Sequence, residues 1–202
     1  MKKRKGSFLI TIGLLLLAAA FGLTGYNIYE SNRAEKSSDY AVQEIKTVID
    51  KVAGENTEEI PDYIKFPQKE MPTVEIDGRR YVGIVEFPTL GLSLPVMAGE
   101  WDYDKLEIAP CCYSGSIYEN NMVIAAHNYR SHFARINKLD IGSEVYFTDV
   151  EGNIFSYVVG WVDILQSTDV EEMKTGADWD LTLFTCTYGG RTRYTVRCVL
   201  QE

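Results

Sequence analysis

Hydrophobic and polar positions divide the chain into three stretches with different patterns. The first, residues 7–26, is an uncharged run made mostly of Leu, Ile, Ala, Phe and Gly. Roughly 20 apolar residues at ~1.5 Å per residue span the hydrocarbon core of a bilayer, so this run predicts a transmembrane helix. Basic residues precede it and acidic residues follow it, which places the N-terminus inside the cell and the remainder outside.

A cleaved signal peptide is the alternative to a permanent anchor, because the three alanines at 18–20 form an acceptable cleavage site. The apolar character continues beyond them through Phe21, Leu23 and Tyr26. This continuation favours an anchor that is retained.

The second stretch predicts a helix over residues 31–56, with Gly54 as the signal that terminates it. One face of this helix is apolar and carries Ala41, Ile45, Val48, Ile49 and Val52. Such a helix is either docked on the following domain or a juxtamembrane stalk, and a stalk that acts as a spacer is the favoured interpretation. Pro61, Pro67 and Pro72 then indicate a linker, because proline interrupts regular backbone pairing.

The third stretch has a β pattern from about Arg80 onward. Short runs rich in branched and aromatic residues predict strands at 81–87, 92–97, 122–126, 144–148, 154–162, 181–185 and 194–200. Residues 101–108 and 130–139 fit helical or loop insertions. Many short strands with few helices predict a mainly β domain, either a closed barrel or a sandwich.

Composition is consistent with one globular domain and an N-terminal extension, since 46% of the 202 residues are hydrophobic. The net charge of −9 includes four basic residues at positions 2–5. The rest of the chain therefore carries 16 positive against 29 negative charges, a net −13. Such an acidic domain argues against nucleic acid as a partner.

The four cysteines, at 111, 112, 186 and 198, have neither metal-ligand spacing nor the density of a disulfide framework. At least one free thiol is therefore expected. Cys186 stands where a strand-like run ends and a turn through Gly189 and Gly190 begins. A thiol there is an oxidation liability unless it has a use, so a catalytic role competes with the common role of cysteine as a small buried residue.

His127 directly follows the apolar run 122–126 and is one of only two histidines. A catalytic cysteine needs a neighbour that exchanges protons, and the pKa of imidazole suits this near neutrality. A structural histidine is the alternative interpretation. His132 falls in a polar segment and is predicted to be an ordinary loop or helix residue.

Arg193 opens the last strand on the face opposite its apolar positions, which include Cys198 as an expected core residue. The hairpin from Cys186 to Arg193 is short enough to bring both to one end of a strand pair. An arginine there can donate to a developing oxyanion. Arg191 competes for this role but lies in the turn, and an exposed arginine without chemistry is the alternative for Arg193.

Residues that flank the cysteine are further candidates. A backbone N–H beside Cys186 is expected to add a second oxyanion donor. Thr185 is placed to orient the site or the substrate, and Tyr188 is a second candidate for substrate binding.

These motifs resemble the sortase family. Thr182-Leu-Phe-Thr-Cys186 is similar to the sortase signature Thr-Leu-X-Thr-Cys, and Val123-Ile-Ala-Ala-His127 resembles the strand that ends on the family's catalytic histidine. Arg193-Tyr-Thr-Val resembles the strand that opens on its catalytic arginine, and residues 87–97 resemble its first barrel hairpin. The likeness covers roughly residues 75–202, with the motifs in the family's order.

The resemblance implies a closed eight-stranded β-barrel with short helices at the surface of a Gram-positive cell. Its segments are a basic cytoplasmic tail (1–6), a transmembrane anchor (7–26), a helical stalk and linker (27–74) and the catalytic barrel (75–202).

The resemblance also implies the activity of a cysteine transpeptidase, which cleaves Leu-Pro-X-Thr-Gly-like sorting signals between Thr and Gly. Cys186 would carry the acyl group as a thioester. His127 would act as general acid and then as general base, and Arg193 would hold the oxyanion and the substrate. The acceptor would be an amine of a peptidoglycan precursor or a lysine of a pilin subunit.

The sequence departs from the family in a few places. Ala126 replaces a glycine found in many relatives. The segment between Leu165 and Leu181 is short and acidic, which argues against the class with a long specificity loop, and no clear lid precedes the barrel. No metal or other cofactor is expected except calcium. Some relatives bind calcium beside this segment, but a solvated acidic loop is the favoured interpretation of Asp169, Glu171, Glu172, Asp178 and Asp180.

Two other functions are compatible with the same residues. A non-catalytic surface binding domain could retain the barrel, and a cysteine hydrolase would use water as the acceptor. The shape of the groove and its exclusion of water, rather than the catalytic residues, separate a hydrolase from a transpeptidase.

Overall fold

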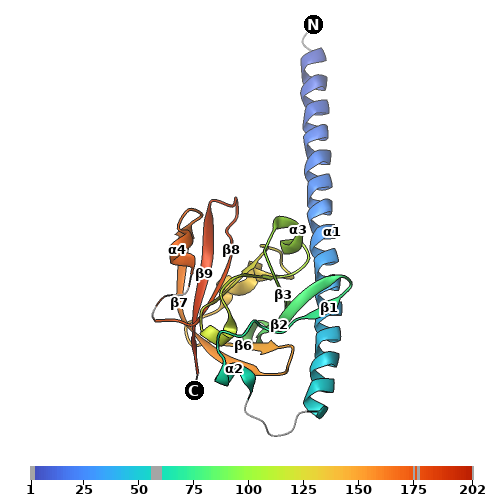
Figure 1. The fold of residues 1–202 in the computed structure, drawn as a ribbon. Coiled ribbons are helices and arrows are strands. Elements are labelled where there is room, and N and C mark those ends of the chain that lie inside the picture. The colour runs from blue at the N-terminus through green and yellow to red at the C-terminus, as the bar shows by residue number, and fades with distance from the viewer. Residues whose placement is uncertain (1–2, 56–60, 175, 177, 202) are drawn as a thin grey trace.

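The computed structural model describes residues 3–55, 61–174, 176 and 178–201, and consists of one long helix beside a β-barrel (Figure 1). Helix α1 spans Lys3–Glu55. The strands are β1 (Val74–Ile76), β2 (Arg79–Phe87), β3 (Leu92–Met97), β4 (Cys111–Ser114), β5 (Met122–Ala126), β6 (Glu144–Asp149), β7 (Ile154–Gln166), β8 (Leu181–Cys186) and β9 (Thr192–Leu200). The short helices are α2 (Asp62–Lys65), α3 (Tyr103–Leu106) and α4 (Val170–Met173), with 3-10 turns η1 (Pro88–Leu90), η2 (Ile117–Glu119) and η3 (Phe133–Lys138).

The strands follow one another in the order β1-β2-β3-β4-β5-β8-β9-β7-β6, and β6 pairs back onto β2. This pairing closes strands β2 to β9 into an eight-stranded barrel, with β1 as a short extra strand on β2. Gly83 permits the closure, since a Cβ built on it would lie 2.2 Å from the carbonyl oxygen of Thr148 on β6. The predicted closed barrel with short helices is confirmed.

Apolar side chains form two layers, as alternation along each strand requires. One cluster fills the barrel and includes Ile124 of β5 and Leu183 of β8. A second cluster lies on the outer face and includes Ala125 and Phe184 of the same two strands. Ala41, Val42 and Ile45 of α1 belong to this outer cluster and are buried. The interpretation of this helix as a spacer is therefore wrong, because its apolar face docks on the barrel.

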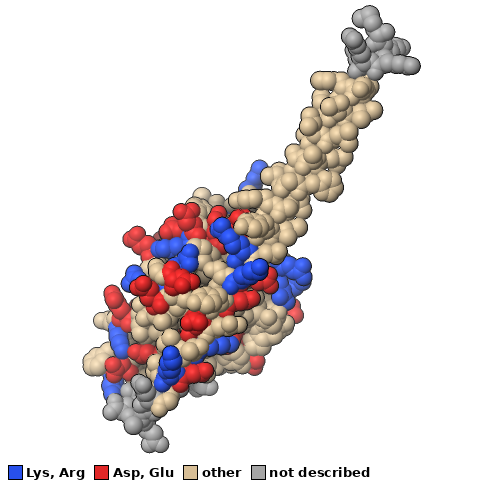
Figure 2. Space-filling model, turned by 90° about the vertical axis from the view of Figure 1, so that its right-hand side faces the viewer, with Lys and Arg blue, Asp and Glu red and all other residues tan. Residues whose placement is uncertain are grey.

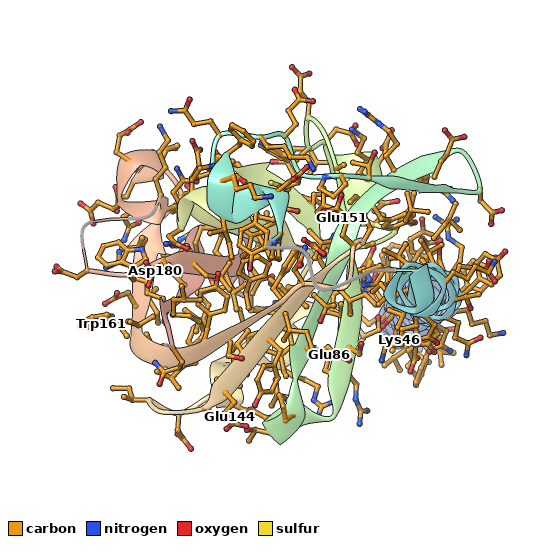
Figure 3. The ribbon with its side chains drawn as sticks, turned by 60° about the horizontal axis from the view of Figure 1, so that its bottom comes forward. Lys46, Glu86, Glu144, Glu151, Trp161 and Asp180 are labelled. Carbon is orange, nitrogen blue, oxygen red and sulfur yellow. The ribbon has the colours of Figure 1, made fainter. Side chains whose placement is uncertain are left out.

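Helix α1 runs without interruption from its projecting half to its docked half. Every residue from 6 to 29 is exposed, and burial begins at Glu30. The projecting half is long and apolar enough to cross a membrane, and its residues 6–29 carry no charged side chain, so this part of the helix is tan in Figure 2. Near the other end of the helix, Lys46 Nζ lies 3.1 Å from Glu86 Oε1 of β2 (Figure 3).

Candidate active site

Three adjacent strands bring the sequence candidates together. Parallel strands β5 and β8 are in register so that Ala126 lies opposite Thr185, which places His127 beside Cys186. Antiparallel strands β8 and β9 pair Cys186 directly with Arg193. His127, Cys186 and Arg193 therefore meet at one end of the barrel, although 66 positions separate the first from the last.

All three side chains project from the outer face of the barrel. Ala125 and Phe184 belong to the outer cluster, so the alternating strand geometry sends His127 and Cys186, two residues further on, to the same side. On β9, Val196 and Cys198 fill the barrel interior. Arg193 has the opposite parity and faces outward like its partner Cys186.

A cleft of about 860 Å³ opens at this end of the barrel. His127, Cys186, the turn residues 187–190 and the loop residues 128–130 line it on the barrel side. Helix α1 forms the facing wall with Thr24, Asn27, Ile28, Ser31 and Asn32. Tyr188 is fully exposed at the tip of the β8–β9 hairpin.

All four cysteines carry free thiols. Burial raises the pKa of Cys111 to about 12 and of Cys112 to about 11, and it raises the pKa of Cys198 as well. These three thiols are held in the protonated, unreactive form at neutral pH. Cys186 differs in position, since it is partly exposed and lines the cleft.

His127 is half-buried, and this desolvation lowers the pKa of its imidazole, with the nearby Glu107 carboxylate acting in the opposite direction. The imidazole is therefore neutral at pH 7 and able to accept a proton. The ring of Tyr129 stacks on it in parallel, with centroids 4.0 Å apart and planes 6° apart. This contact could not be predicted from the sequence, because a tyrosine two residues after a strand has many possible orientations.

His132 lies in the turn before η3, in agreement with its prediction as a loop residue, and its side chain is completely buried. Ser38 of α1 covers it, with 3.3 Å between Ser38 Oγ and His132 Nε2. Ser38 Oγ donates to the carbonyl oxygen of Ile108 at 3.2 Å, so His132 Nε2 is the donor to Ser38 and Nδ1 carries the lone pair. Burial and the neighbouring His127 lower the pKa of His132 to about 4, and a backbone hydrogen bond with Ile108 acts in the opposite direction.

The guanidinium of Arg193 is held from one side by the hairpin. Its Nη1 donates to the carbonyl oxygens of Gly190 at 2.9 Å and Thr192 at 3.2 Å. Within the described part of the chain, Nη2 and Nε have no hydrogen-bond acceptor. Arg191 is exposed in the turn and is not paired with Cys186.

The β8–β9 turn is stiff for its length. Thr187 N donates to Thr192 O at 3.0 Å, Gly190 N donates to Thr187 O at 2.9 Å, and the Thr187 and Thr192 hydroxyls lie 2.6 Å apart. The positive φ angles of Gly189 and Gly190, 85° and 72°, suit the turn to glycine. The N–H of Thr187 is therefore already engaged, and the expectation of an oxyanion donor is wrong for this neighbour of Cys186.

Thr185 supports the site from within the barrel. It is 4% exposed, and its hydroxyl donates to the carbonyl oxygen of Ala126 at 2.9 Å. This bond ties the end of β8 to the residue before His127 and fixes the spacing of the two strand ends. Thr185 does not line the cleft, and its hydroxyl is bonded to Ala126 instead of being open to the predicted contact with a substrate.

The acidic segment between β7 and β8 folds back on the outer face of β9. Arg197 reaches across it, with its guanidinium 4.2 Å from the ring centroid of Trp179 and Nη1 3.1 Å from Asp163 Oδ2. Met173 of α4 is buried in the outer cluster together with Phe184. Among the described residues, no group of three or more His, Cys, Asp or Glu side chains is arranged to hold a metal ion.

Comparison with known proteins identifies relatives. The family model of the sortase domain matches residues 85–201, more than half of the chain. Sortase A of Bacillus anthracis is 26% identical over 183 residues, which cover 87% of this chain and 85% of that protein.

Solved structures share the fold. A sortase D5 transpeptidase of Clostridium perfringens superposes with a TM-score of 0.63 at 22% identity, over 83% of this chain and 99% of that one. A Clostridium perfringens sortase C with the C-terminal cell wall sorting motif gives a TM-score of 0.54 at 22% identity, over 91% and 99% of the two chains.

Proposed function

The chain belongs to the sortase family of transpeptidases, and we propose that it is an active, membrane-anchored cysteine transpeptidase. Its proposed substrates are proteins with Leu-Pro-X-Thr-Gly-like sorting signals, cleaved between Thr and Gly. The observation that carries this proposal is the register of β5, β8 and β9, which gathers His127, Cys186 and Arg193 on one outer face.

In the first half of the reaction, the neutral imidazole of His127 accepts the proton of the Cys186 thiol, and the sulfur attacks the threonine carbonyl carbon. The negative charge moves to the carbonyl oxygen, where the unoccupied edge of Arg193 donates hydrogen bonds. The C–N bond then breaks as His127 returns the proton to the leaving glycine nitrogen. The acyl group remains as a thioester on Cys186.

In the second half, an amine attacks the thioester carbonyl and His127 accepts its proton. The C–S bond breaks, and the proton passes from His127 to the sulfur of Cys186. The result is a new amide bond and the starting thiol. We propose that this amine belongs to a peptidoglycan precursor or to a pilin lysine.

An apolar strip leads away from Cys186 and supports binding of the apolar part of such a signal. Phe184 lies two residues before the nucleophile on the same face, and its ring meets Tyr113 edge-on with centroids 5.2 Å apart. Trp101 continues the strip at 5.3 Å from Tyr113, and Met173 adds an aliphatic side chain to the same cluster. Phe184 and Met173 are buried within this cluster, so Trp101, which is 36% exposed, and the partly exposed Tyr113 are the members of the strip that leucine and proline side chains of a signal can contact.

The exposed apolar half of α1 supports single-pass anchoring in the cell membrane through residues 7–26. The basic tail at residues 2–5 supports an N-terminus in the cytoplasm and a catalytic barrel outside the cell.

Mass spectrometry of the full chain in mild detergent tests the proposal. The chain is incubated with a labelled Leu-Pro-X-Thr-Gly peptide, with and without an added amine such as triglycine. We expect a thioester on Cys186 and ligated product, both lost in Cys186→Ala and retained in the matched control Cys112→Ala. Cleavage without ligation would identify a hydrolase, and no acylation by any peptide of a sorting-signal panel would identify a binding domain.

A further inference from the structure

Helix α1 turns one stripe of side chains toward the catalytic cleft. Thr24, Asn27, Ile28 and Ser31 line the cleft opposite Cys186 and follow one another at intervals of three, one and three residues. This spacing places them on a single helix face. The stripe begins inside the apolar run 7–26 and ends beyond it.

Hydrogen bonds fix the height of this stripe relative to the catalytic residues. The hydroxyl of Ser131, four residues after His127, donates to the carbonyl oxygen of Ser31 at 3.1 Å. About two turns further along α1, Ser38 bonds to His132 and Ile108. Because the helix is continuous from Lys3 to Glu55, no flexible joint separates the barrel from the apolar run.

The position of the cleft along the membrane normal follows from helix geometry. Residues 7–26 extend over about 30 Å at 1.5 Å per residue, which matches the hydrocarbon thickness of a bilayer. The four residues from Tyr26 to Glu30, where the barrel begins to cover the helix, add only ~6 Å. If residues 7–26 cross the bilayer, the cleft opens within the layer of lipid headgroups.

The side chains around the cleft suit that layer. Tyr188 at the hairpin tip is fully exposed, and Tyr26 and Tyr29 are each 62% exposed on α1. Tyrosine is enriched where membranes meet water. Arg130 and Arg191 are exposed beside the same cleft and turn, where they can meet lipid phosphates. The hairpin points to the same end of the molecule as the projecting half of α1 (Figure 1).

We infer that the catalytic end of the barrel rests on the phospholipid surface, with the β8–β9 hairpin and Tyr188 among the headgroups and α1 as the inner wall of the cleft. This inference rests on the membrane anchoring proposed above and adds a second, peripheral contact with the lipid. Substrates then reach Cys186 sideways along the bilayer surface, so that segments close to a membrane tether are the ones presented to the thiol.

Fluorescence quenching tests the contact in the full chain, reconstituted into phosphatidylcholine–phosphatidylglycerol vesicles that contain a lipid with a nitroxide on its headgroup. Tyr188→Trp adds an emitter at the hairpin tip. The matched control Ile154→Trp adds one at a site that is 67% exposed at the far end of the barrel. The wild-type signal of the three native tryptophans is subtracted from both.

We expect the nitroxide lipid to remove at least half of the emission added by Tyr188→Trp and to leave that of Ile154→Trp unchanged. Flotation of the protein with the vesicles shows that the anchor is intact. In a protein that floats, equal quenching of the two added tryptophans would overturn the inference. Failure of the wild-type protein to float would instead refute the proposed membrane anchoring, and the peripheral lipid contact would be refuted together with it.

An insertion provides a second, independent measurement. Seven residues added between Ile28 and Tyr29 make about two helical turns, which keep the docked face in phase and lift the barrel ~10 Å from the bilayer. Quenching of Tyr188→Trp should then fall to the level of Ile154→Trp while flotation is unchanged. Undiminished quenching would show that α1 does not set the height of the hairpin.

Discussion

Arg193 and Cys186 are direct partners in the β8–β9 ladder, and Arg193 Nη1 donates to two carbonyl oxygens, of Gly190 and Thr192, in the hairpin that joins them. One edge of the guanidinium is therefore fixed to the backbone of the turn. The remaining donors sit in the same rigid plane and are aimed by that attachment. The ammonium group of a lysine is a compact point charge without this planar fork. It therefore cannot bind the turn carbonyls with one edge while it presents a fixed second edge to the substrate oxygen.

Arg193→Lys should accordingly lower turnover by roughly 10²–10³-fold, the usual effect of losing an oxyanion donor, although the charge is conserved. Arg191→Lys is the matched control and should retain near wild-type turnover, since Arg191 is exposed in the turn. Steady-state ligation kinetics measure both. Near-normal turnover in Arg193→Lys with a large loss in Arg191→Lys would reverse the assignment of the two arginines.

The stacked ring of Tyr129 predicts a positioning role toward His127. Aromatic stacking contributes ~0.5–1.5 kcal/mol, so Tyr129→Ala should lower turnover about two- to tenfold. Removing the ring also lets water reach the imidazole, whose pKa burial holds below its ordinary value. That pKa should rise, and because the neutral imidazole is the base, the acid limb of kcat/KM should move to higher pH.

Tyr129→Phe keeps the stacked ring and is the control for this prediction. Its pH profile should coincide with that of the wild type. A profile for Tyr129→Ala that also coincides with the wild type would show that the ring has no influence on His127 and serves only to pack the loop.

The core of the site was predictable because it depends on strand ends. Apolar runs at 122–126 and 181–185 define two buried strands, and the residues that follow such strands lie at their exits. The hairpin length then places Arg193 near Cys186. What the sequence left open was the pairing of β5 with β8, a parallel contact between segments that are far apart in the chain.

The burial of a side chain by residues that are distant in the sequence was not predictable. His132 has polar neighbours in the sequence, and it is buried only because Ser38, 94 positions away, lies over it. Thr195 has the parity of an exposed residue but is completely buried. Strands β1 and β4 were missed because each has only three or four residues, too few to display alternation.

The buried His132 predicts that stability depends on pH. Its pKa is about 4 in the folded chain against an ordinary 6.5, so between these values the unfolded chain binds a proton that the folded chain does not. The free energy of unfolding should therefore fall as pH is lowered from 6.5 to 4, by roughly 3 kcal/mol at ~1.4 kcal/mol per pKa unit.

His132→Gln provides the comparison, because its amide N–H can still donate to Ser38 but does not titrate. Urea denaturation of both proteins in the same detergent between pH 7.5 and 4 separates this histidine from the carboxylates, which titrate in both. The wild type should lose more stability than the variant on acidification. Parallel curves for the two proteins would rule out His132 as the source.

The acidic segment between β7 and β8 predicts indifference to calcium. Asp169 accepts from Gln166 N at 2.9 Å, Asp180 accepts from Leu200 N at 2.8 Å, and Glu171 pairs with Lys174 at 2.9 Å. A calcium ion needs six to eight oxygen ligands, so it would have to break these contacts to be coordinated here. Excess EDTA should leave turnover unchanged, and millimolar calcium should not raise the melting temperature measured by differential scanning fluorimetry. Magnesium at the same concentration controls for ionic strength, and a rise of several degrees with calcium alone would show that the segment rearranges into a site.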